Sequence, residues 1–492
     1  MKGNSIRWLL SLAAASAMLV ACAGAAAAQQ AGAIDSIRAL RLAEAAVEAV
    51  NSGDSARIRS LVTDRLSPKA LAGAPASAYF DQFMTMWRQS GGVDIRSAER
   101  FGHGLALTLW ARRADAGIML YASADRDDTT RADHLDALRA FHPSARVRPI
   151  DATGGDSAVL ARIDAELTRL TAAGEFSGTV AISRRGRVVY DRGFGVADLR
   201  TGELNGAATT YHIASVGKTF TAVAIAQLVD AGRLSLDDPL AKALPAYHWR
   251  PAAAAVTVRQ LLGHRSGLGQ GQRVADSLEA QWADTAEPAF PPGTRWSYSN
   301  DGYLILAAIV ERVSGQPFLG YLRRHVWAPA GMASAGGSAS AAPRTGRATG
   351  YARADADVFG LDPRVPNSAL VHGAGNGAGG EYVTAADLLR FAAGITSGRL
   401  LRRATFDSLV APAAQAPFGG PYADERYAYG FVTRPVGDRR TFGHAGGGMG
   451  WGICARLDAT DDGEWGVAVA SNFDPPVCED VSRAVIATMI RR

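Results

Sequence analysis

Residues 211–232 read Tyr211-His-Ile-Ala-Ser215-Val-Gly-Lys218-Thr-Phe-Thr-Ala-Val-Ala-Ile-Ala-Gln-Leu-Val-Asp-Ala-Gly232. The part from Phe220 to Val229 is apolar on nearly every side, which predicts a buried helix. Gly232 follows it, where a helix can end in the left-handed conformation. A helix that starts near Ser215 places the serine hydroxyl at its positive end and Lys218 on the same face. A serine with an amine within reach is a nucleophile with its own base, provided that burial lowers the pKa of the amine.

Lysine is rare in this chain. Among 52 basic residues it occurs only at positions 2, 69, 218 and 242. Arginine does not release its proton in proteins, so of the two basic residues only lysine can serve as a base. Lys218, three residues after Ser215, therefore indicates catalysis. Because a serine and a lysine at this spacing also arise by chance, other residues must support the interpretation.

The chain begins with the features of an export signal. Lys2 and Arg7 precede an apolar run from Trp8 to Ala21, which is too short to span a membrane, and small residues follow. Cleavage after Ala28 would remove a signal peptide of residues 1–28. A bacterial lipobox ending at Cys22 would instead remove residues 1–21 and leave Cys22 lipidated. Both routes stay open, and either predicts an exported, periplasmic protein, which only the lipobox route would anchor to the membrane, through a lipid on Cys22.

Composition limits the remaining classes. With 492 residues, 48% of them hydrophobic, the chain can bury a large core and is expected to form two domains. The formal charge of +5 includes Lys2 and Arg7, and residues 1–28 hold no acidic residue, so the mature chain carries +3. No block of basic residues occurs, which gives no reason to expect a nucleic-acid partner. The oligomeric state stays open.

Two cysteines follow the leader region, Cys454 and Cys478. In an oxidising periplasm they are candidates for a disulfide. Two unpaired cysteines in the core are the alternative, because the sequence does not give the distance between them.

Residues 34–150 predict a small α+β domain, because helical patterns precede short runs with β character. The expected helices are Ile34–Val50, Ser55–Asp64 and Ala76–Gln89, and the expected strands are Val93–Ala98, Leu105–Ala111 and Ile118–Ala122, with Leu135–Phe141 either strand or helix. The domain is faintly similar to nuclear-transport-factor-like (NTF2-like) or cystatin-like modules, and its role is not readable. Asp127, Asp128 and His134 show no repeated ligand spacing, so we interpret them as a solvated turn rather than a metal site. Pro143–Ser157 is the expected linker.

Residues 155–492 predict a second domain. The expected elements are a helix at Ala158–Ala172, a hairpin of Gly178–Ser183 with Arg187–Asp191, the helix after Ser215, a short helix from Val258, an apolar helix at Leu304–Val313, paired strands at Trp451–Leu457 and Trp465–Ala470, and a closing helix at Asp480–Ile490.

Two further stretches carry candidate chemistry. Tyr298 and Asn300 lie on a loop before the apolar helix, where side chains can reach a cleft. A phenol beside an ammonium loses its proton more easily, so Tyr298 is a candidate base, and Asn300 can bridge the lysine and a substrate amide. An ordinary buried tyrosine with an Asx turn is the alternative.

The last candidate stretch contains His444, Gly446 and Gly447. Glycines at this density let a substrate lie against the backbone and let amides point at an oxyanion. A lone histidine beside glycines, however, is more often structural than catalytic.

Together, Ser215-x-x-Lys218, Tyr298-x-Asn300 and His444-x-Gly446 resemble the three motifs of penicillin-recognising serine hydrolases, the β-lactamase-related family nearest the class C enzymes. The resemblance runs from about Ser177 to the C-terminus. It is supported by three further stretches, Leu261–Leu268, Pro329–Met332 and Gly379–Asp387.

The resemblance implies an α/β fold, in which an antiparallel sheet is flanked by helices and an all-helical part carries the Tyr298 loop. It also implies acyl transfer in two steps. Ser215 attacks a carbonyl carbon, Lys218 and Tyr298 handle its proton, and the amides of Ser215 and Gly447 hold the oxyanion. Asn300, His444 and Gly446 would contact a small-molecule or peptide substrate. No metal or organic cofactor is implied.

The third motif departs from the best-known members, which carry Lys-Thr-Gly or His-Thr-Gly. Here the middle residue is Ala445, which has no hydroxyl for a substrate carboxylate, and His444 lacks a permanent charge. We therefore expect an esterase or peptidase rather than a true β-lactamase, with esters or amides that lack this carboxylate as the better substrates. Arg265 is a candidate for a replacement cation.

The sequence also leaves alternatives to this class. A D-alanyl-D-alanine carboxypeptidase or a β-lactamase is the alternative within the family. A non-catalytic module that binds cell-wall fragments or β-lactams is the alternative outside enzymes. A metallohydrolase is disfavoured because no H-E-x-x-H or H-x-H occurs, and an unrelated Ser-His-Asp esterase because no G-x-S-x-G surrounds Ser215.

Overall fold

The computed structural model describes residues 39–66, 71, 75–101, 104–113, 117–124, 135–141, 147–245, 251–268, 287–337, 346–353, 364–367, 375–411, 416–419, 422–448 and 451–491. The predicted leader with Cys22, and the turn with Asp127, Asp128 and His134, lie outside these residues. Contacts divide the described residues into two compact units, residues 39–141 and residues 147–491, so the boundary lies at the beginning of the predicted linker. Within the described part, no helix combines the length and apolar character needed to cross a membrane.

The first unit has the predicted α+β order. Residues 39–52 are helical, and α2 (Ser55–Arg65), α4 (Ala76–Ser90), β1 (Val93–Phe101), β2 (Gly104–Ala111), β3 (Gly117–Ala124) and β4 (Leu135–Phe141) follow. The four strands form one antiparallel sheet in chain order, so Leu135–Phe141 is a strand. Alternate residues of β2, such as Leu107 and Leu109, pack with Ile58 and Phe83 of the helices, so one sheet face is covered.

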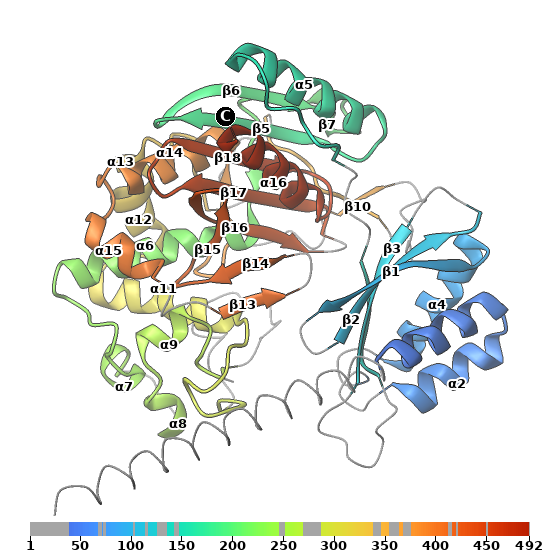
Figure 1. The fold of residues 1–492 in the computed structure, drawn as a ribbon. Helices are drawn as coiled ribbons and strands as arrows, with labels where there is room; N and C mark the ends of the chain where they lie inside the picture. Colours follow the sequence, from blue (N-terminus) through green and yellow to red (C-terminus); the bar gives the residue numbers. More distant parts are fainter. Residues whose placement is uncertain are drawn as a thin grey trace, which may run out of the picture. The chain divides into compact units, whose positions relative to one another are not determined.

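An antiparallel eight-stranded sheet is the centre of the second unit (Figure 1). Its order across the sheet is β13 (Ala416–Gly419), β14 (Tyr422–Tyr427), β15 (Val432–Val436), β16 (Arg439–Gly448), β17 (Ile453–Thr460), β18 (Trp465–Ser471), β5 (Gly178–Arg184) and β6 (Arg187–Phe194). The predicted β5–β6 hairpin and β17–β18 pair are confirmed. Strands β13 to β16 were not predicted.

Helices cover both faces of this sheet. Val180, Val467 and Val469 point to one face and pack with α5 (Asp156–Ala172) and α16 (Val477–Ile490). Their neighbours Ala181 and Ala468 point to the other face, where they join the core formed by α6 and the other helices. Because successive side chains of a strand point to opposite faces, burial of both faces explains why β18 is buried at every residue.

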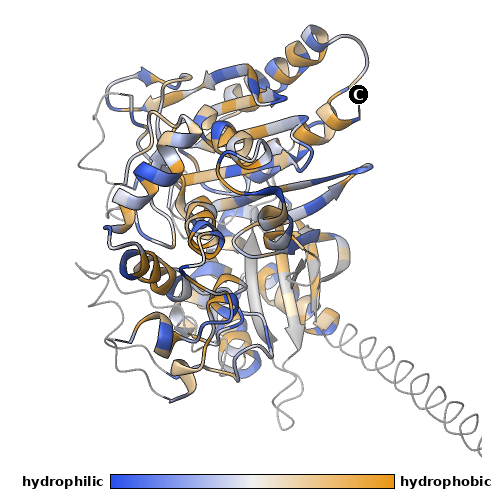
Figure 2. Cartoon of the chain, turned by 90° about the vertical axis from the view of Figure 1, so that its left-hand side faces the viewer, coloured by the Kyte–Doolittle hydropathy of each residue, from blue (hydrophilic) through white to orange (hydrophobic). Residues whose placement is uncertain are grey.

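The remaining helices form the second layer. They are α6 (Lys218–Asp230), α7 (Leu240–Ala243), α8 (Pro251–Ala254), α9 (Val258–Leu262), α11 (Asn300–Ser314), α12 (Phe318–Leu322), α13 (Ala328–Ala330), α14 (Ala385–Thr396) and α15 (Arg403–Leu409), with the π-helical turn η2 (Arg323–Trp327). The predicted helix after Ser215 is α6, and ten of its residues are buried. Gly232 and Gly315 follow α6 and α11 with φ of +67° and +72°, as the sequence predicted for Gly232. Figure 2 colours the chain by hydropathy, and the helices turned to the viewer carry both apolar and hydrophilic residues.

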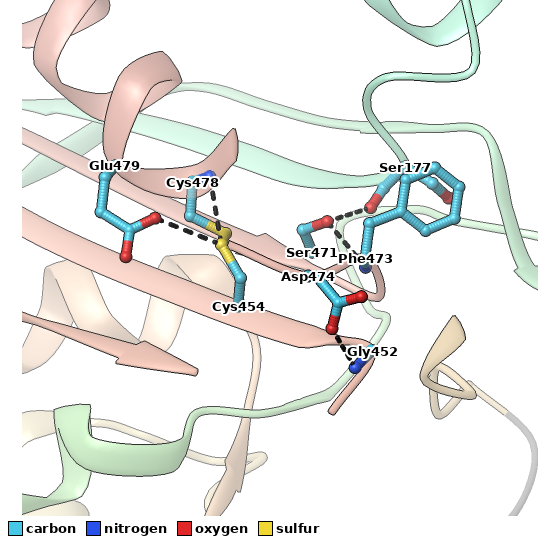
Figure 3. Close-up of a disulfide and its surroundings, with 8 residues drawn as sticks. All are labelled: Ser177, Gly452, Cys454, Ser471, Phe473, Asp474, Cys478 and Glu479. Atoms are coloured by element: carbon cyan, nitrogen blue, oxygen red, sulfur yellow. Dashed lines mark hydrogen bonds between the residues drawn. A yellow bond between two sulfur atoms is a disulfide. The ribbon is translucent and has the colours of Figure 1, made fainter. Parts of the chain in front are cut away.

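A disulfide fastens α16 to the sheet. It joins Cys454 of β17 to Cys478 at the start of α16, across a separation of 24 residues (Figure 3). The backbone N–H of Cys478 also donates to the sulfur of Cys454, at 3.1 Å. One face of the sheet is therefore held to its covering helix by a covalent bond as well as by apolar packing.

We expect this disulfide to contribute measurably to the free energy of unfolding. Replacing both cysteines, as Cys454→Ala with Cys478→Ala, should lower the free energy of unfolding by about 3 kcal/mol, because the unfolded chain regains the freedom of a closed loop. Urea unfolding of both proteins measures the difference, and reduced wild-type protein is the control for the alanine side chains. Equal unfolding midpoints in oxidised and reduced wild type would contradict the prediction.

Candidate active site

Ser215 lies in a tight turn between a strand and a helix. The turn is the 3₁₀ segment η1 (Ala214–Gly217). The sequence predicted a helix that starts near Ser215, but α6 begins at Lys218. Ala214 has a φ of +45°, a conformation that costs a non-glycine residue about 1 kcal/mol or more and that recurs at functional sites. Directly before this turn, β9 (Tyr211–His212) pairs with β12 (Tyr382–Val383), which holds the turn in place.

Lys218 is fully buried and makes three polar contacts. Its Nζ lies 2.7 Å from Asn300 Oδ1, 2.7 Å from the carbonyl oxygen of Ala378, and 3.1 Å from Ser215 Oγ. The first two oxygens can only accept hydrogen bonds. A neutral amine has two N–H groups, which these acceptors use, so its lone pair faces the Ser215 hydroxyl.

Burial also adjusts the protonation of Lys218. It lowers the pKa of the amine to about 7, and the negative charge of Glu381 opposes this shift. An ammonium is costly in an apolar interior, so a large part of the protein carries a neutral Lys218 near neutral pH. Lys218 could serve as the base for Ser215 only if burial lowered the pKa of its amine, and this requirement is met.

Tyr298 and Asn300 lie at the start of α11. Ser299 caps this helix by accepting a hydrogen bond from the N–H of Gly302, at 3.0 Å. The Tyr298 ring centre lies 4.9 Å from Lys218 Nζ. Burial raises the pKa of the Tyr298 phenol, and a hydrogen bond with Ser215 only partly offsets this rise. The expected lowering by the lysine is not found, since the site excludes water and favours the neutral phenol.

His264 is a residue of this site to which the sequence assigned no role. It is fully buried after α9, and its Nδ1 accepts a hydrogen bond from the N–H of Ser299, at 3.1 Å. Its ring centre lies 4.3 Å from the Tyr298 ring and 4.6 Å from that of Tyr427. His264 thus holds the loop that carries Tyr298. Its position in the stretch Leu261–Leu268 was the one signal that could have found it.

The third motif lies on strand β16. His444 is buried, and burial together with the charge of Lys218 lowers its pKa to about 3, so the imidazole is neutral at physiological pH. Its Nδ1 faces the carbonyl of Ala445. The motif therefore presents neither a positive charge nor, at Ala445, a hydroxyl.

Gly446 lets β16 approach the Ser215 turn. A Cβ at this position would lie 2.2 Å from the carbonyl oxygen of Ile213 and 2.9 Å from the Ser215 nitrogen, closer than real Cβ atoms come. Gly447 follows with a φ of +142°, which other residues avoid. In the turn between β16 and β17, the N–H of Gly452 donates a hydrogen bond to Asp474, at 2.6 Å (Figure 3).

The structure thus brings the predicted catalytic and substrate-binding residues of the second unit together. Ser215, Lys218 and Asn300 are joined by contacts of 3.1 Å or less, Tyr298 lies over the lysine, and the backbone of Gly446 lies against the serine. Cys454 and Cys478 form the disulfide on the α16 side of the sheet. Within the described residues, no group of His, Cys, Asp and Glu could hold a metal ion.

Comparison with known proteins identifies the same region. The Beta-lactamase family model matches residues 163–487. The putative penicillin-binding protein PbpX of Bacillus subtilis (strain 168) is 30% identical over 249 residues, which cover 50% of this chain and 61% of that protein. Esterase EstB of Burkholderia gladioli is 32% identical over 204 residues, covering 37% and 52% of the two proteins. Teichoic acid D-alanine hydrolase of Staphylococcus aureus is 26% identical over 282 residues, covering 55% and 66%. The chain thus spans less than two thirds of each relative.

Solved structures agree in fold. The octameric penicillin-binding protein homologue from Pyrococcus abyssi superposes with a TM-score of 0.60 at 24% identity, over 68% of this chain and 78% of that one. The D-amino acid amidase from Ochrobactrum anthropi SV3 gives a TM-score of 0.57 at 24% identity, over 67% and 98%. At these identities the likeness establishes the fold. The predicted antiparallel sheet with flanking helices is confirmed.

The close approach at Gly446 predicts a selective loss of reactivity. Gly446→Ala should push β16 away from the Ser215 turn and slow acylation of Ser215 about 100-fold, because a displacement near 1 Å has that effect on aligned groups. The rate of labelling by a fluorophosphonate measures this change. Gly206→Ala is the matched control, since an added Cβ there meets no atom within 4 Å. Equal labelling rates for the two variants would refute the prediction.

Proposed function

The chain belongs to the β-lactamase family of serine hydrolases, and we propose that it cleaves an ester or amide bond through an acyl–enzyme on Ser215. One observation carries the proposal. The buried Lys218 amine lies 3.1 Å from the Ser215 hydroxyl, while its other two contacts are fixed acceptors. A nucleophile and a base are therefore aligned before any substrate binds.

The first step forms a covalent bond. Ser215 Oγ bonds to the substrate carbonyl carbon, and its proton passes to the neutral Lys218 amine. The carbonyl oxygen gains negative charge, which the N–H groups of Ser215 and Gly447 would stabilise. The ammonium of Lys218 then returns the proton, by way of the Tyr298 hydroxyl, to the leaving oxygen or nitrogen. Water repeats the sequence on the acyl carbon and frees the serine.

The third motif guides our choice of substrate. Ala445 offers no hydroxyl and His444 is neutral, so neither side chain can pair with the carboxylate of a β-lactam or of a peptide ending in D-alanine. We therefore favour esters or amides that lack this carboxylate. The names of the relatives, an esterase and a teichoic acid D-alanine hydrolase, support a hydrolase outside the β-lactamases proper.

Export is part of the proposal. The apolar run Trp8–Ala21 and the small residues after it favour a periplasmic protein, either cleaved after Ala28 or lipidated at Cys22. The intact mass of protein purified from its host separates the two routes, because a lipidated Cys22 adds the mass of its acyl chains.

The proposal predicts one covalent adduct. Mature protein exposed separately to a fluorophosphonate and to p-nitrophenyl butyrate should gain a single phosphonyl or acyl mass, which Ser215→Ala abolishes, whereas benzylpenicillin should leave little or no adduct. Hydrolysis of p-nitrophenyl butyrate should fall by a factor of about 10⁴ or more in this variant, since the nucleophile is lost. Ser408→Ala, at an exposed serine, is the control.

The reagents also separate the alternatives. Ester hydrolysis should exceed nitrocefin hydrolysis in kcat/KM, and equal values would reject the proposed substrate class. If folded protein gained no adduct from any reagent, the proposal of catalysis would fail in favour of a module that binds cell-wall fragments.

The lowered pKa of Lys218 predicts the pH dependence. Only the neutral amine can take the proton of Ser215, so kcat/KM for the ester should rise with pH around a midpoint near 7. Measurements between pH 5 and 10 check this. If the Tyr298 phenolate were the base, the rate would instead continue to rise towards pH 10, because burial raises the pKa of that phenol.

A further inference from the structure

Glu381 is a buried acid for which the proposed reaction has no use. Its side chain is fully buried, and neither carboxyl oxygen has a hydrogen-bond partner in another described residue. Burying a carboxyl group without a partner is costly, and native proteins seldom do it without a functional reason. Glu381 lies in the stretch Gly379–Asp387, directly before β12.

The backbone ties Glu381 to the Ser215 turn. Its carbonyl oxygen accepts a hydrogen bond from the N–H of Ile213, at 3.0 Å, two residues before the nucleophile. A Cβ on nearby Gly379 would lie 2.0 Å from the carbonyl oxygen of Ala214. The loop that carries Glu381 is therefore packed directly on the turn, and its Ala378 carbonyl accepts from Lys218.

The carboxyl group itself points at the same turn. A Cβ on Gly217 would lie 1.9 Å from Glu381 Oε2, so this oxygen rests against the backbone between Ser215 and Lys218. On its other side, a Cβ on Gly375 would lie 3.0 Å from Glu381 Cγ. Two glycines thus make room for an acid beside the catalytic pair.

Glu381 and Lys218 influence each other's protonation. Burial raises the pKa of Glu381 to about 8, and the charge of Lys218 and the backbone N–H of Glu381 itself oppose this rise. Two charged groups lie farther out, Arg347 over the Tyr382 ring and Arg456, whose charge acts on His444. The imidazoles and phenols around the site are neutral near pH 7, because burial lowers the pKa of the imidazoles and raises that of the phenols. They are His212, His264, Tyr298, Tyr303, Tyr427 and His444.

We propose that Glu381 is a positioning residue for the reaction of Ser215, and that its carboxyl group decides by its charge whether Lys218 is an amine or an ammonium. The two groups share one proton near neutral pH, either as acid and amine or as carboxylate and ammonium. Lys218 can take the proton of Ser215 when Glu381 holds the shared proton, and a carboxylate at Glu381 instead favours the ammonium, which cannot act as a base. This inference rests on the proposed function and adds Glu381 to the residues that take part in it.

Lysine NMR tests the proposal without any substrate. The full chain has four lysines, so mature protein labelled with ¹³C at lysine Cε gives few signals, and Lys69→Arg and Lys242→Arg identify the other two of the mature chain. In wild type, the Lys218 signal should titrate in two steps, because two groups share the proton. In Glu381→Gln it should titrate in one step, about one pH unit lower, because the carboxylate that favours the ammonium is gone.

Three variants make the outcome decisive. Glu381→Leu should move the Lys218 titration in the same direction as Gln, and Glu381→Asp, which keeps the acid, should stay near wild type. Glu479→Gln is the matched control, because it removes a partly buried carboxyl group of raised pKa beside the disulfide, away from Lys218. An unchanged Lys218 titration in folded Glu381→Gln or Glu381→Leu would overturn the inference.

Kinetics separate this inference from the proposed function. In Glu381→Gln, the midpoint of the pH profile for fluorophosphonate labelling should fall by about one unit, whereas loss of packing alone would change the rate at every pH equally. If wild type is labelled and the Glu381→Gln profile superposes on that of wild type, the inference fails and the proposed function stands. If wild type is not labelled, the proposed function fails, and the NMR titration still decides whether Glu381 controls Lys218.

Discussion

The site depends on a single buried amine. Lys218 has no access to solvent, so its polar atom must be satisfied by the protein, and the three groups that satisfy it come from different parts of the chain. Asn300 is 82 residues away and Ala378 is 160 residues away, whereas Ser215 lies on the adjacent turn. Because the amine forms hydrogen bonds to these partners, it holds α6, α11 and the loop before β12 in one arrangement, and this arrangement aligns the serine.

Glycine is the second constraint, because two backbone segments and one side chain converge on residues 213–217. Gly446 brings β16 against Ile213, Gly379 brings its loop against Ala214, and Gly217 leaves space for the carboxyl group of Glu381. In each case a Cβ would lie 2.2 Å or less from a neighbouring oxygen. The eight-stranded sheet and its disulfide supply the rigid body on which these approaches are fixed.

The convergence also makes the interior of the site almost free of charge. Imidazoles and phenols around Lys218 are neutral near pH 7, since burial penalises their charged forms. A low-dielectric surrounding strengthens the electrostatic interactions that remain, those of Lys218 with Ser215 and with Glu381. The same property bears on recognition, because a neutral His444 beside Ala445 suits an uncharged acyl group better than a carboxylate.

The sequence by itself determined the local features of this protein. Apolar runs predicted α6 and α11, a glycine predicted the end of α6, short β-type runs predicted β5, β6 and the β17–β18 pair, and the three motifs predicted the family. Strands β13 to β16 were missed because glycine, arginine and proline interrupt their apolar pattern. The contact of His264 with the Tyr298 loop, the burial of Glu381 against the Ser215 turn and the raised pKa of Tyr298 were decided only by the tertiary structure, because each arises from burial among residues far apart in the chain, which no local pattern records.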